Sequence, residues 1–179
     1  MIRPARLADA PALAGIYGHH VLTGLATFEE IPPPAEEMAR RLSAVQRLRL
    51  PYLVSEEAGV VVGFAYASPF RPRSAYRYTA EDSIYLAPQA IGRGLGRTLL
   101  AEIVAACEAL GLRQLMAGIG DSANTASIGL HRALGFEAVG TSRAVGFKFG
   151  RWVDVVWMQR RLGPGEAEPP SSAGLALGT

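Results

Sequence analysis

Residues 81–111 read EDSIYLAPQAIGRGLGRTLLAEIVAACEALG, and this stretch decides the architecture of the chain. It predicts a short strand over residues 83–86, then a loop crowded with glycine, and then a long helix. The helix is predicted because apolar side chains recur every three or four residues and form one stripe along a cylinder. The stripe consists of Leu95, Leu99, Ile103, Cys107 and Leu110, and Gly111 ends it. This order places the start of a helix directly beside the end of a strand.

The loop from Gly92 to Gly96 has the properties of an anion site. The first turn of a helix has backbone N–H groups without partners, and the aligned peptide dipoles make that end partly positive. Glycines let a phosphate approach the backbone closely, and Arg93 and Arg97 add positive charge. The loop is therefore predicted to bind a pyrophosphate. The alternative is that the glycines only form a tight turn between the strand and the helix.

Two common phosphate loops do not fit the stretch. A Walker loop, GxxxxGK[ST], needs lysine where Arg97 stands and glycine where Ile91 stands, and a dinucleotide fingerprint, GxGxxG, needs glycine at Arg97 or Leu99. The loop instead resembles the pyrophosphate loop of the GNAT N-acetyltransferase superfamily, [QR]xxGx[GA], which binds coenzyme A. We lay this motif on residues 91–96, where Ile91 replaces the usual Gln or Arg. A second register, starting at Gln89, also matches but ends the motif two residues earlier.

A second pattern follows in the order expected for the same superfamily. Residues 124–136 read NTASIGLHRALGF, which resembles the signature NxxAxxLYxxxGF, with His131 in place of the usual Tyr. The stretches at 27–29 (TFE), 78–81 (YTAE) and 146–154 (GFKFGRWVD) resemble the phosphinothricin and methionine sulfoximine acetyltransferases within it. The resemblance covers about residues 1–160.

This resemblance implies an α/β fold in which a central, mostly antiparallel mixed sheet is flanked by helices. A chain of 179 residues falls in the size range of one domain, which we predict over residues 1–162. Residues 163–179 are rich in Pro, Gly, Ser and Ala and are predicted to form a disordered tail.

The implied activity is transfer of an acetyl group from acetyl-CoA, the co-substrate, to the α-amine of a small amino acid or analogue. An amine is mostly protonated at neutral pH, so a base must help to remove a proton. The resemblance places this base at Glu81 and a second acid or base at His131. Strand alternation puts Glu81, Ser83 and Tyr85 on one face. Which residue is the base, and whether a water lies between, stays open. Glu81 paired with an arginine and His131 packed against the main chain are the alternatives.

Two further groups of residues are predicted to bind the two substrates. The acetyl-CoA site is expected to use strand amides, the glycine loop and the second motif: Tyr85, Leu86, Ala87, Gly92, Arg93, Gly94, Leu95, Gly96, Arg97, Asn124 and Ser127. The loop over residues 69–79 contains three arginines and two tyrosines without apolar periodicity. Guanidinium groups bind carboxylates through two hydrogen bonds, so this loop is predicted to bind the acceptor. The alternative is an ordinary solvated loop. The acceptor residues are expected to be Phe28, Arg71, Arg73 and Tyr76.

Composition limits the other classes of function. A net charge of +2 with scattered basic residues does not predict nucleic-acid binding, and no apolar run is long enough to span a membrane. The single cysteine, Cys107, excludes an internal disulfide and suits the cytoplasm, and its place on the apolar stripe predicts a core residue, not a nucleophile. His19 and His20 have no neighbouring ligands at metal-site spacing, so no metal is predicted.

The partners and the acceptor are less determined. The resemblance implies a homodimer, and the aromatic bridge over residues 143–152 is a candidate contact with a second subunit. Packing of this bridge within one subunit is the alternative. Two other functions stay open: acetylation of another amine, such as a protein N-terminus or a polyamine, and a noncatalytic acyl-CoA sensor. The natural acceptor is not determined by the sequence.

Overall fold

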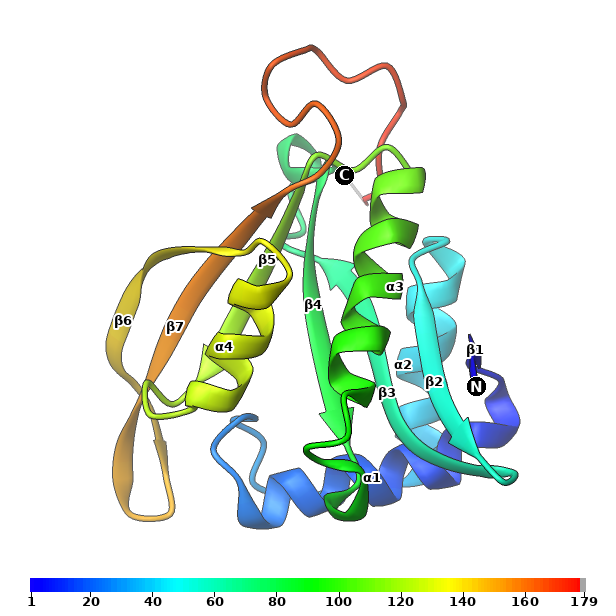
Figure 1. Cartoon of the computed structure of the whole chain (residues 1–179), viewed down its shortest axis with the longest axis vertical. Coiled ribbons are helices and arrows are strands. Elements are labelled where there is room, and N and C mark those ends of the chain that lie inside the picture. The colour runs from blue at the N-terminus through cyan, green and yellow to red at the C-terminus, as the bar shows by residue number, and fades with distance from the viewer. Residues whose placement is uncertain (178–179) are drawn as a thin grey trace.

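The computed structural model describes residues 1–177, and these form one mixed sheet with helices on both faces (Figure 1). The strand order among the described residues is β1-β2-β3-β4-β5-β7-β6. The strands are β1 (Ile2–Pro4), β2 (Tyr52–Glu57), β3 (Val60–Pro69), β4 (Thr79–Leu86), β5 (Gln114–Gly120), β6 (Glu137–Lys148) and β7 (Arg151–Arg161). The helices are α1 (Ala10–Thr23), α2 (Ala35–Arg47), α3 (Leu95–Ala109) and α4 (Thr125–Ala133), with short 3-10 turns η1 (Leu7–Asp9), η2 (Ser74–Tyr76) and η3 (Pro88–Ala90).

Only one neighbouring pair of strands in this sheet is parallel. β4 pairs with β5 in parallel, and every other neighbouring pair is antiparallel. The mixed, mostly antiparallel sheet expected from the sequence is therefore confirmed. The parallel pairing covers only Thr79–Asp82 opposite Gln114–Ala117, although both strands continue beyond it. The two strands diverge below this point in Figure 1.

The alternation of side chains assigns each face of β4 to a different pair of helices. Tyr85 packs edge-on against Tyr17 of α1, with ring centroids 4.9 Å apart, so the odd-numbered residues of β4 face α1 and α2. Asp82 contacts His131 of α4, so the even-numbered residues face α3 and α4. Figure 1 shows α3 and α4 together in front of the sheet.

The predicted helix after the glycine loop is present as α3, and its stripe enters the core. Leu99, Ile103 and Cys107 are fully buried, whereas Leu110 is partly exposed at the C-terminal end. Burial of each large apolar side chain stabilises the fold by about 1.5–3 kcal/mol. The stripe fixes α3 against the sheet, and this holds the glycine loop at the end of β4.

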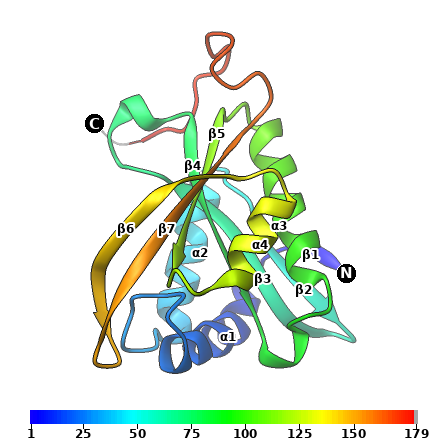
Figure 2. The same cartoon turned by 60° about the vertical axis from the view of Figure 1, so that its left-hand side comes forward.

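The predicted bridge over residues 143–152 is mostly strand. β6 runs to Lys148 and β7 starts at Arg151, so the connection is only Phe149 and Gly150, both with positive φ (53° and 73°). Positive φ at both turn residues is the conformation that joins two antiparallel strands tightly. β6 and β7 therefore form a long curved hairpin, which we call the β6–β7 arm, at one edge of the sheet (Figure 2).

The C-terminal segment differs from the expectation of disorder. Residues 163–177 return to the start of β4, where the Tyr78 hydroxyl donates to the Ser172 carbonyl (2.8 Å) and the Leu175 N–H donates to the Arg77 carbonyl (2.8 Å). The Leu175 side chain is buried in the main core. The composition of this segment predicts disorder because it contains few large apolar residues. In the structure, Leu175 and Leu177 pack against the core. Gly178 and Thr179, the end of the predicted tail, lie outside the described residues.

Candidate active site

A pocket lies between β4 and β5 where the two strands diverge, lined by residues 82–85 and 117–120. We call it the opening, and it forms the centre of the site. The Ala87 N–H donates to the Val62 carbonyl of β3 (2.9 Å), and residues of an antiparallel strand alternate between their two sides. The backbone groups of Ile84 and Leu86 therefore face the opening, while those of Tyr85 and Ala87 face β3. Of the three residues predicted to offer free amides, only Leu86 directs its N–H into the opening.

A groove of about 720 Å³ runs from this opening to the start of α3. Gly92 and Gly94 line it with φ of +78° and +79°, a left-handed conformation that side chains disfavour, and a Cβ on either would meet open space. Gly94 is the N-cap of α3, so the first N–H groups of the helix point out at this end of the groove. This placement agrees with the motif register on residues 91–96. The exposed side chain of Ile91 lines the same groove.

The two arginines of the glycine loop have different surroundings. Arg97 lines the groove. Arg93 instead forms a bidentate ion pair with Glu57 of β2, with both N–O distances 2.9 Å. The sequence predicted that both arginines bind the pyrophosphate. In the structure Arg97 lies at the groove, whereas Arg93 is paired with Glu57.

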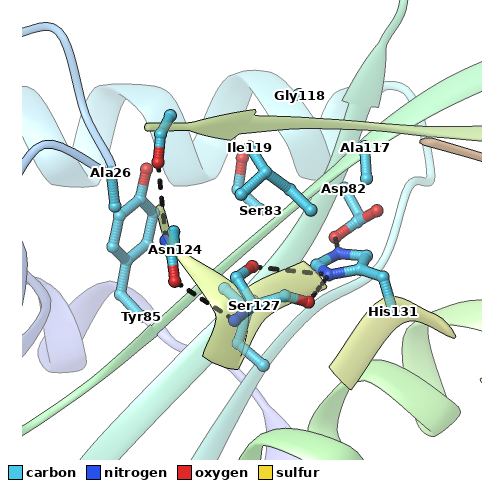
Figure 3. A pocket seen from close by; sticks show the side chains of 12 residues that line it. Ala26, Asp82, Ser83, Tyr85, Ala117, Gly118, Ile119, Asn124, Ser127 and His131 are labelled. Carbon is cyan, nitrogen blue, oxygen red and sulfur yellow. Dashed lines mark hydrogen bonds and ion pairs between the residues drawn. The ribbon is translucent and has the colours of Figure 1, made fainter. Parts of the chain in front are cut away.

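Asn124 and Ser127 line both the groove and the pocket at the opening, and Figure 3 shows their side chains in that pocket. The Asn124 side-chain oxygen accepts a hydrogen bond from the Ser127 N–H (3.1 Å) and so caps the start of α4. A cap of this kind satisfies one backbone donor and fixes the helix end. These two predicted residues are therefore brought together with the glycine loop.

His131 is buried on the α3–α4 side of the sheet, and its two ring nitrogens are both engaged (Figure 3). Nε2 lies 3.0 Å from Asp82 Oδ2, and Nδ1 lies 2.7 Å from the Ser127 carbonyl oxygen. Burial lowers the pKa of His131, but the hydrogen bond and charge of Asp82 and the Ser127 carbonyl outweigh it, so this pKa is raised. The geometry shows a packed, hydrogen-bonded histidine and does not bring it together with Glu81.

Glu81 lies on the opposite face, half-buried beside β5 and β7. A Cβ on Gly118 would stand 3.0 Å from Glu81 Oε1 and 3.0 Å from the ring of Trp157, so the carboxyl occupies space that a side chain would fill. Burial raises the pKa of Glu81, the positive charge of Arg71 lowers it, and the charge of Asp82 raises it, with a net increase. A carboxyl with a raised pKa is a stronger base than an ordinary glutamate.

The predicted acceptor residues are only partly gathered around Glu81. The Arg71 guanidinium stacks over Phe70 at 4.1 Å and lies 5.9 Å from the Trp157 ring, close enough to Glu81 to act on its pKa. Arg73 and Tyr76 are exposed on the same loop. The Tyr76 ring packs against Phe70, the ring on which Arg71 stacks. Of the three, Arg71 alone acts electrostatically on the carboxyl.

Phe28 lies on the connection between α1 and α2, with 42% of its surface exposed. Its ring rests on Gly146 of β6, where an added Cβ would overlap the Phe28 Cε1 position. The adjoining Ala26 lines both the groove and the opening. Phe28 therefore stands on the rim of the site between α1 and the β6–β7 arm.

Three residues of the site were not predicted from the sequence. His20 Nε2 lies 2.8 Å from the Leu86 carbonyl, which fixes the end of β4, and burial lowers the pKa of this histidine. Trp157 and Gly118 flank Glu81 because β5 pairs with β7 at this position. Their only signal in the sequence is a glycine inside a predicted strand, which often marks close approach of another group.

The remaining candidates for chemistry lie outside the site. Cys107 is fully buried, and burial raises the pKa of its thiol to about 12, which disfavours the thiolate that a covalent route would need. No group of three or more metal-ligating side chains occurs within residues 1–177. Over the same residues, no helix has the length and apolar character required to cross a membrane.

The chain was compared with known protein families, and the result agrees with the glycine loop at the start of α3 and the divergence of β4 from β5. Residues 2–157 match the family described as acetyltransferase (GNAT) domain. The chain belongs to this family and is an acetyltransferase that uses acetyl-CoA.

Individual relatives narrow the class further. The chain is 55% identical to the phosphinothricin N-acetyltransferase of Alcaligenes faecalis over 169 residues, 94% of this chain and 86% of that protein. It is 41% identical to the L-methionine sulfoximine/L-methionine sulfone acetyltransferase of Salmonella typhimurium, over 90% of this chain and 94% of the relative. The crystal structure of a phosphinothricin acetyltransferase from Sinorhizobium meliloti in complex with AcCoA superposes with a TM-score of 0.93 at 50% identity, covering 97% and 94% of the two chains.

Proposed function

We propose that the chain acetylates the α-amine of a small amino acid or analogue of the phosphinothricin, methionine sulfoximine or methionine sulfone type. The observation that carries the proposal is Glu81, a half-buried carboxyl with a raised pKa beside the opening of the sheet, with Arg71 next to it. The names of the relatives support the same acceptor class.

Glu81 is the proposed base. Acetyl-CoA supplies a thioester, which an amine attacks only in its unprotonated form. Glu81 accepts the proton of the acceptor ammonium, and its raised pKa reduces the difference between the pKa values of the carboxyl and the ammonium. The amine nitrogen then bonds to the thioester carbonyl carbon, the carbon–sulfur bond breaks, and coenzyme A leaves as a thiolate that takes a proton from water. The Trp157 ring lies beside this carboxyl and shields one side of it from water.

The proposed acetyl-CoA site is the groove between the opening and the start of α3. The N–H groups at the start of α3 and the Arg97 guanidinium would hold the pyrophosphate, since helix starts and cationic side chains bind anions. The Leu86 N–H, which faces the opening, would bind the thioester oxygen, and Asn124 and Ser127 would line the pantetheine.

The proposed acceptor site uses a different set of side chains. Arg71 would bind the carboxylate of the amino acid, which places the amine at Glu81. Arg73 and Tyr76 would reach the polar tip of its side chain, and Phe28 would form the outer wall. We propose that His131 holds α4 on β4 instead of transferring protons, because both ring nitrogens already have partners.

A panel of acceptors tests this function. Purified enzyme is mixed with acetyl-CoA and each amine, and free thiol is followed spectroscopically. Turnover with phosphinothricin, methionine sulfoximine and methionine sulfone but not with spermidine or an N-terminal peptide supports the proposal. Preference for a polyamine or a peptide would instead support acetylation of that other amine. Binding of acetyl-CoA without turnover on any amine would support a noncatalytic sensor.

We also propose a homodimer formed through the β6–β7 arm, in the cytoplasm. The arm exposes a set of large apolar side chains that a monomer rarely leaves in water: Val139, Val145, Phe147, Phe149 and Trp152. β6 is also an edge strand, and a second copy would cover it. The free, buried thiol of the sole cysteine in the sequence, Cys107, suits a reducing compartment.

Sedimentation velocity tests the dimer. Trp152→Asp should convert a dimer to a monomer, because it places a charge on the exposed arm. Val60→Asp, which also alters an exposed apolar residue but on the β2–β3 hairpin, should leave the dimer intact. A wild-type monomer at micromolar concentration would exclude the assembly.

A further inference from the structure

The side chain of Lys148, at the end of β6, is 1% exposed and points into the molecule, away from the outer surface of the arm. Its Nζ donates to the Gly24 carbonyl (2.9 Å) and to the Thr27 carbonyl (2.8 Å). A buried ammonium is unfavourable unless hydrogen bonds replace its hydration. Here two carbonyls of one short segment, residues 24–28, provide that replacement.

This segment is also held from the other sides. The Leu25 carbonyl lies so close to Gly120 of β5 that an added Cβ there would overlap it. The Phe28 ring lies on Gly146 of β6 in the same way. On the inner side, the buried Thr27 hydroxyl is 2.7 Å from the Tyr17 hydroxyl of α1. Residues 24–28 are therefore clamped between β5, β6 and α1.

The clamped segment lies between the two substrate sites. Gly24, Leu25 and Ala26 line the groove for acetyl-CoA, and Ala26 also borders the opening between β4 and β5. Phe28, two residues further, is the proposed outer wall of the acceptor site. A shift of the segment would move Phe28 with it, whereas Glu81 is carried by β4.

We infer that Lys148 is a positioning residue for the acceptor: its buried ammonium fixes residues 24–28 and thereby sets the place of Phe28. The inference rests on the proposed acceptor site. Lys148 lines neither the groove nor the opening, and it acts through the Gly24 and Thr27 carbonyls.

Lys148→Met tests this role, because it keeps the length of the side chain and removes both hydrogen bonds. We expect kcat/KM for the acceptor to fall about 10²-fold, the size of effect that a small misplacement produces, with a raised KM. The dissociation constant for acetyl-CoA, measured by calorimetry, should change far less. Gln46→Met is the control, since it also removes a side-chain bond to a backbone carbonyl, that of Ala5, but outside the site. Equal losses in acceptor KM and acetyl-CoA affinity, or no loss in either, would overturn the role.

A second variant approaches Phe28 from the other side. Gly146→Ala should displace the Phe28 ring, which is half-exposed, and should raise the acceptor KM while Lys148 stays in place. In a Phe28→Ala background, both Gly146→Ala and Lys148→Met should lose most of their effect on acceptor KM. Effects that stay fully additive would show that Lys148 does not act through Phe28.

Hydrogen exchange separates this inference from the proposed function. Peptides covering residues 21–30 should exchange faster in Lys148→Met than in the wild type and in Gln46→Met. If the wild type acetylates no amino acid, the proposed function fails, and exchange alone decides whether Lys148 clamps the segment. Unchanged exchange over these residues would overturn the clamp even in an active enzyme.

Discussion

His131 Nε2 lies 3.0 Å from Asp82 Oδ2, and both side chains are almost completely buried. The other ring nitrogen, Nδ1, donates to the Ser127 carbonyl, and the contact with Asp82 raises the pKa of His131. This pair fastens α4 to β4 on one face of the sheet. Because neighbouring strand residues point to opposite faces, Glu81 lies on the other face. The buried ion pair and the proposed base are therefore separated by the sheet itself.

Replacing the proposed base should abolish most of the activity. Glu81→Gln keeps the size of the side chain and removes the proton acceptor, so kcat should fall by about 10²-fold or more. Since burial raises the pKa of Glu81, the wild-type rate should rise with pH through a value above that of an ordinary glutamate. The variant should lack this acidic limb. Steady-state rates between pH 5 and 9 check both, with acetyl-CoA affinity as the control for folding. A variant with normal kcat would remove Glu81 from the chemistry.

Asp82→Asn should affect stability more than chemistry. The pKa of His131 is raised in the folded state, so the pair stabilises the fold fully below the unfolded value of about 6.5 and loses this effect as pH rises through the folded pKa. We expect the variant to lose about 3 kcal/mol in the free energy of unfolding at pH 6, the lower end for removal of one partner of a buried pair. The difference from wild type should shrink at pH 9.

Urea unfolding at the two pH values measures this difference. Glu37→Gln provides the control, because Glu37 pairs with Arg40 and Arg41 on the surface of α2, where solvent weakens such pairs and their contribution to stability is small. A pH-independent loss in Asp82→Asn would show that the histidine is neutral in the folded protein.

Local patterns in the sequence predicted much of the framework, because their causes are local. The stripe from Leu99 to Cys107 and the motif that starts at Asn124 depend on residues within a few positions of one another. The glycine loop before α3 follows in the same way from its motif. These features form the groove and the proposed anchor for acetyl-CoA.

Long-range geometry was less accessible from the sequence. Glu81 and Asp82 are adjacent carboxylates, and alternation separates them, but the helix that covers each face is decided by topology. His131 reaches Asp82 across 49 residues, and Trp157 reaches Glu81 only through the register of β5 and β7. Arg93 was assigned to the anion because it flanks the glycine turn, and its partner, Glu57, lies on a strand 36 residues away that the local pattern does not reveal. Similarly, the burial of Leu175 depends on a return of the chain that its composition does not reveal.

The two arginines of the glycine loop should contribute unequally to acetyl-CoA affinity. Arg97→Met removes a cation from the groove and should weaken binding about tenfold, the value of one hydrogen bond to a charged group. Arg93→Met, the matched control, should change affinity little, because Arg93 is already engaged by Glu57. Calorimetry at two salt concentrations measures both, and the Arg97 variant should show the weaker salt dependence. Equal losses would mean that Arg93 leaves Glu57 when acetyl-CoA binds.

Arg71 should set both acceptor affinity and the pH dependence of the rate. Its positive charge lowers the pKa of Glu81 against the effect of burial, so Arg71→Gln should raise that pKa and move the acidic limb of kcat/KM to higher pH. The same variant should raise the acceptor KM about tenfold or more, because a charge-assisted pair with the carboxylate is lost. Arg73→Gln removes the same charge from the same loop, but Arg73 does not act on the pKa of Glu81. The acidic limb of the Arg73→Gln pH profile should therefore stay in place. If the two variants shift the limb equally, the effect comes from the net charge of the loop, and Arg71 has no special relation to the base.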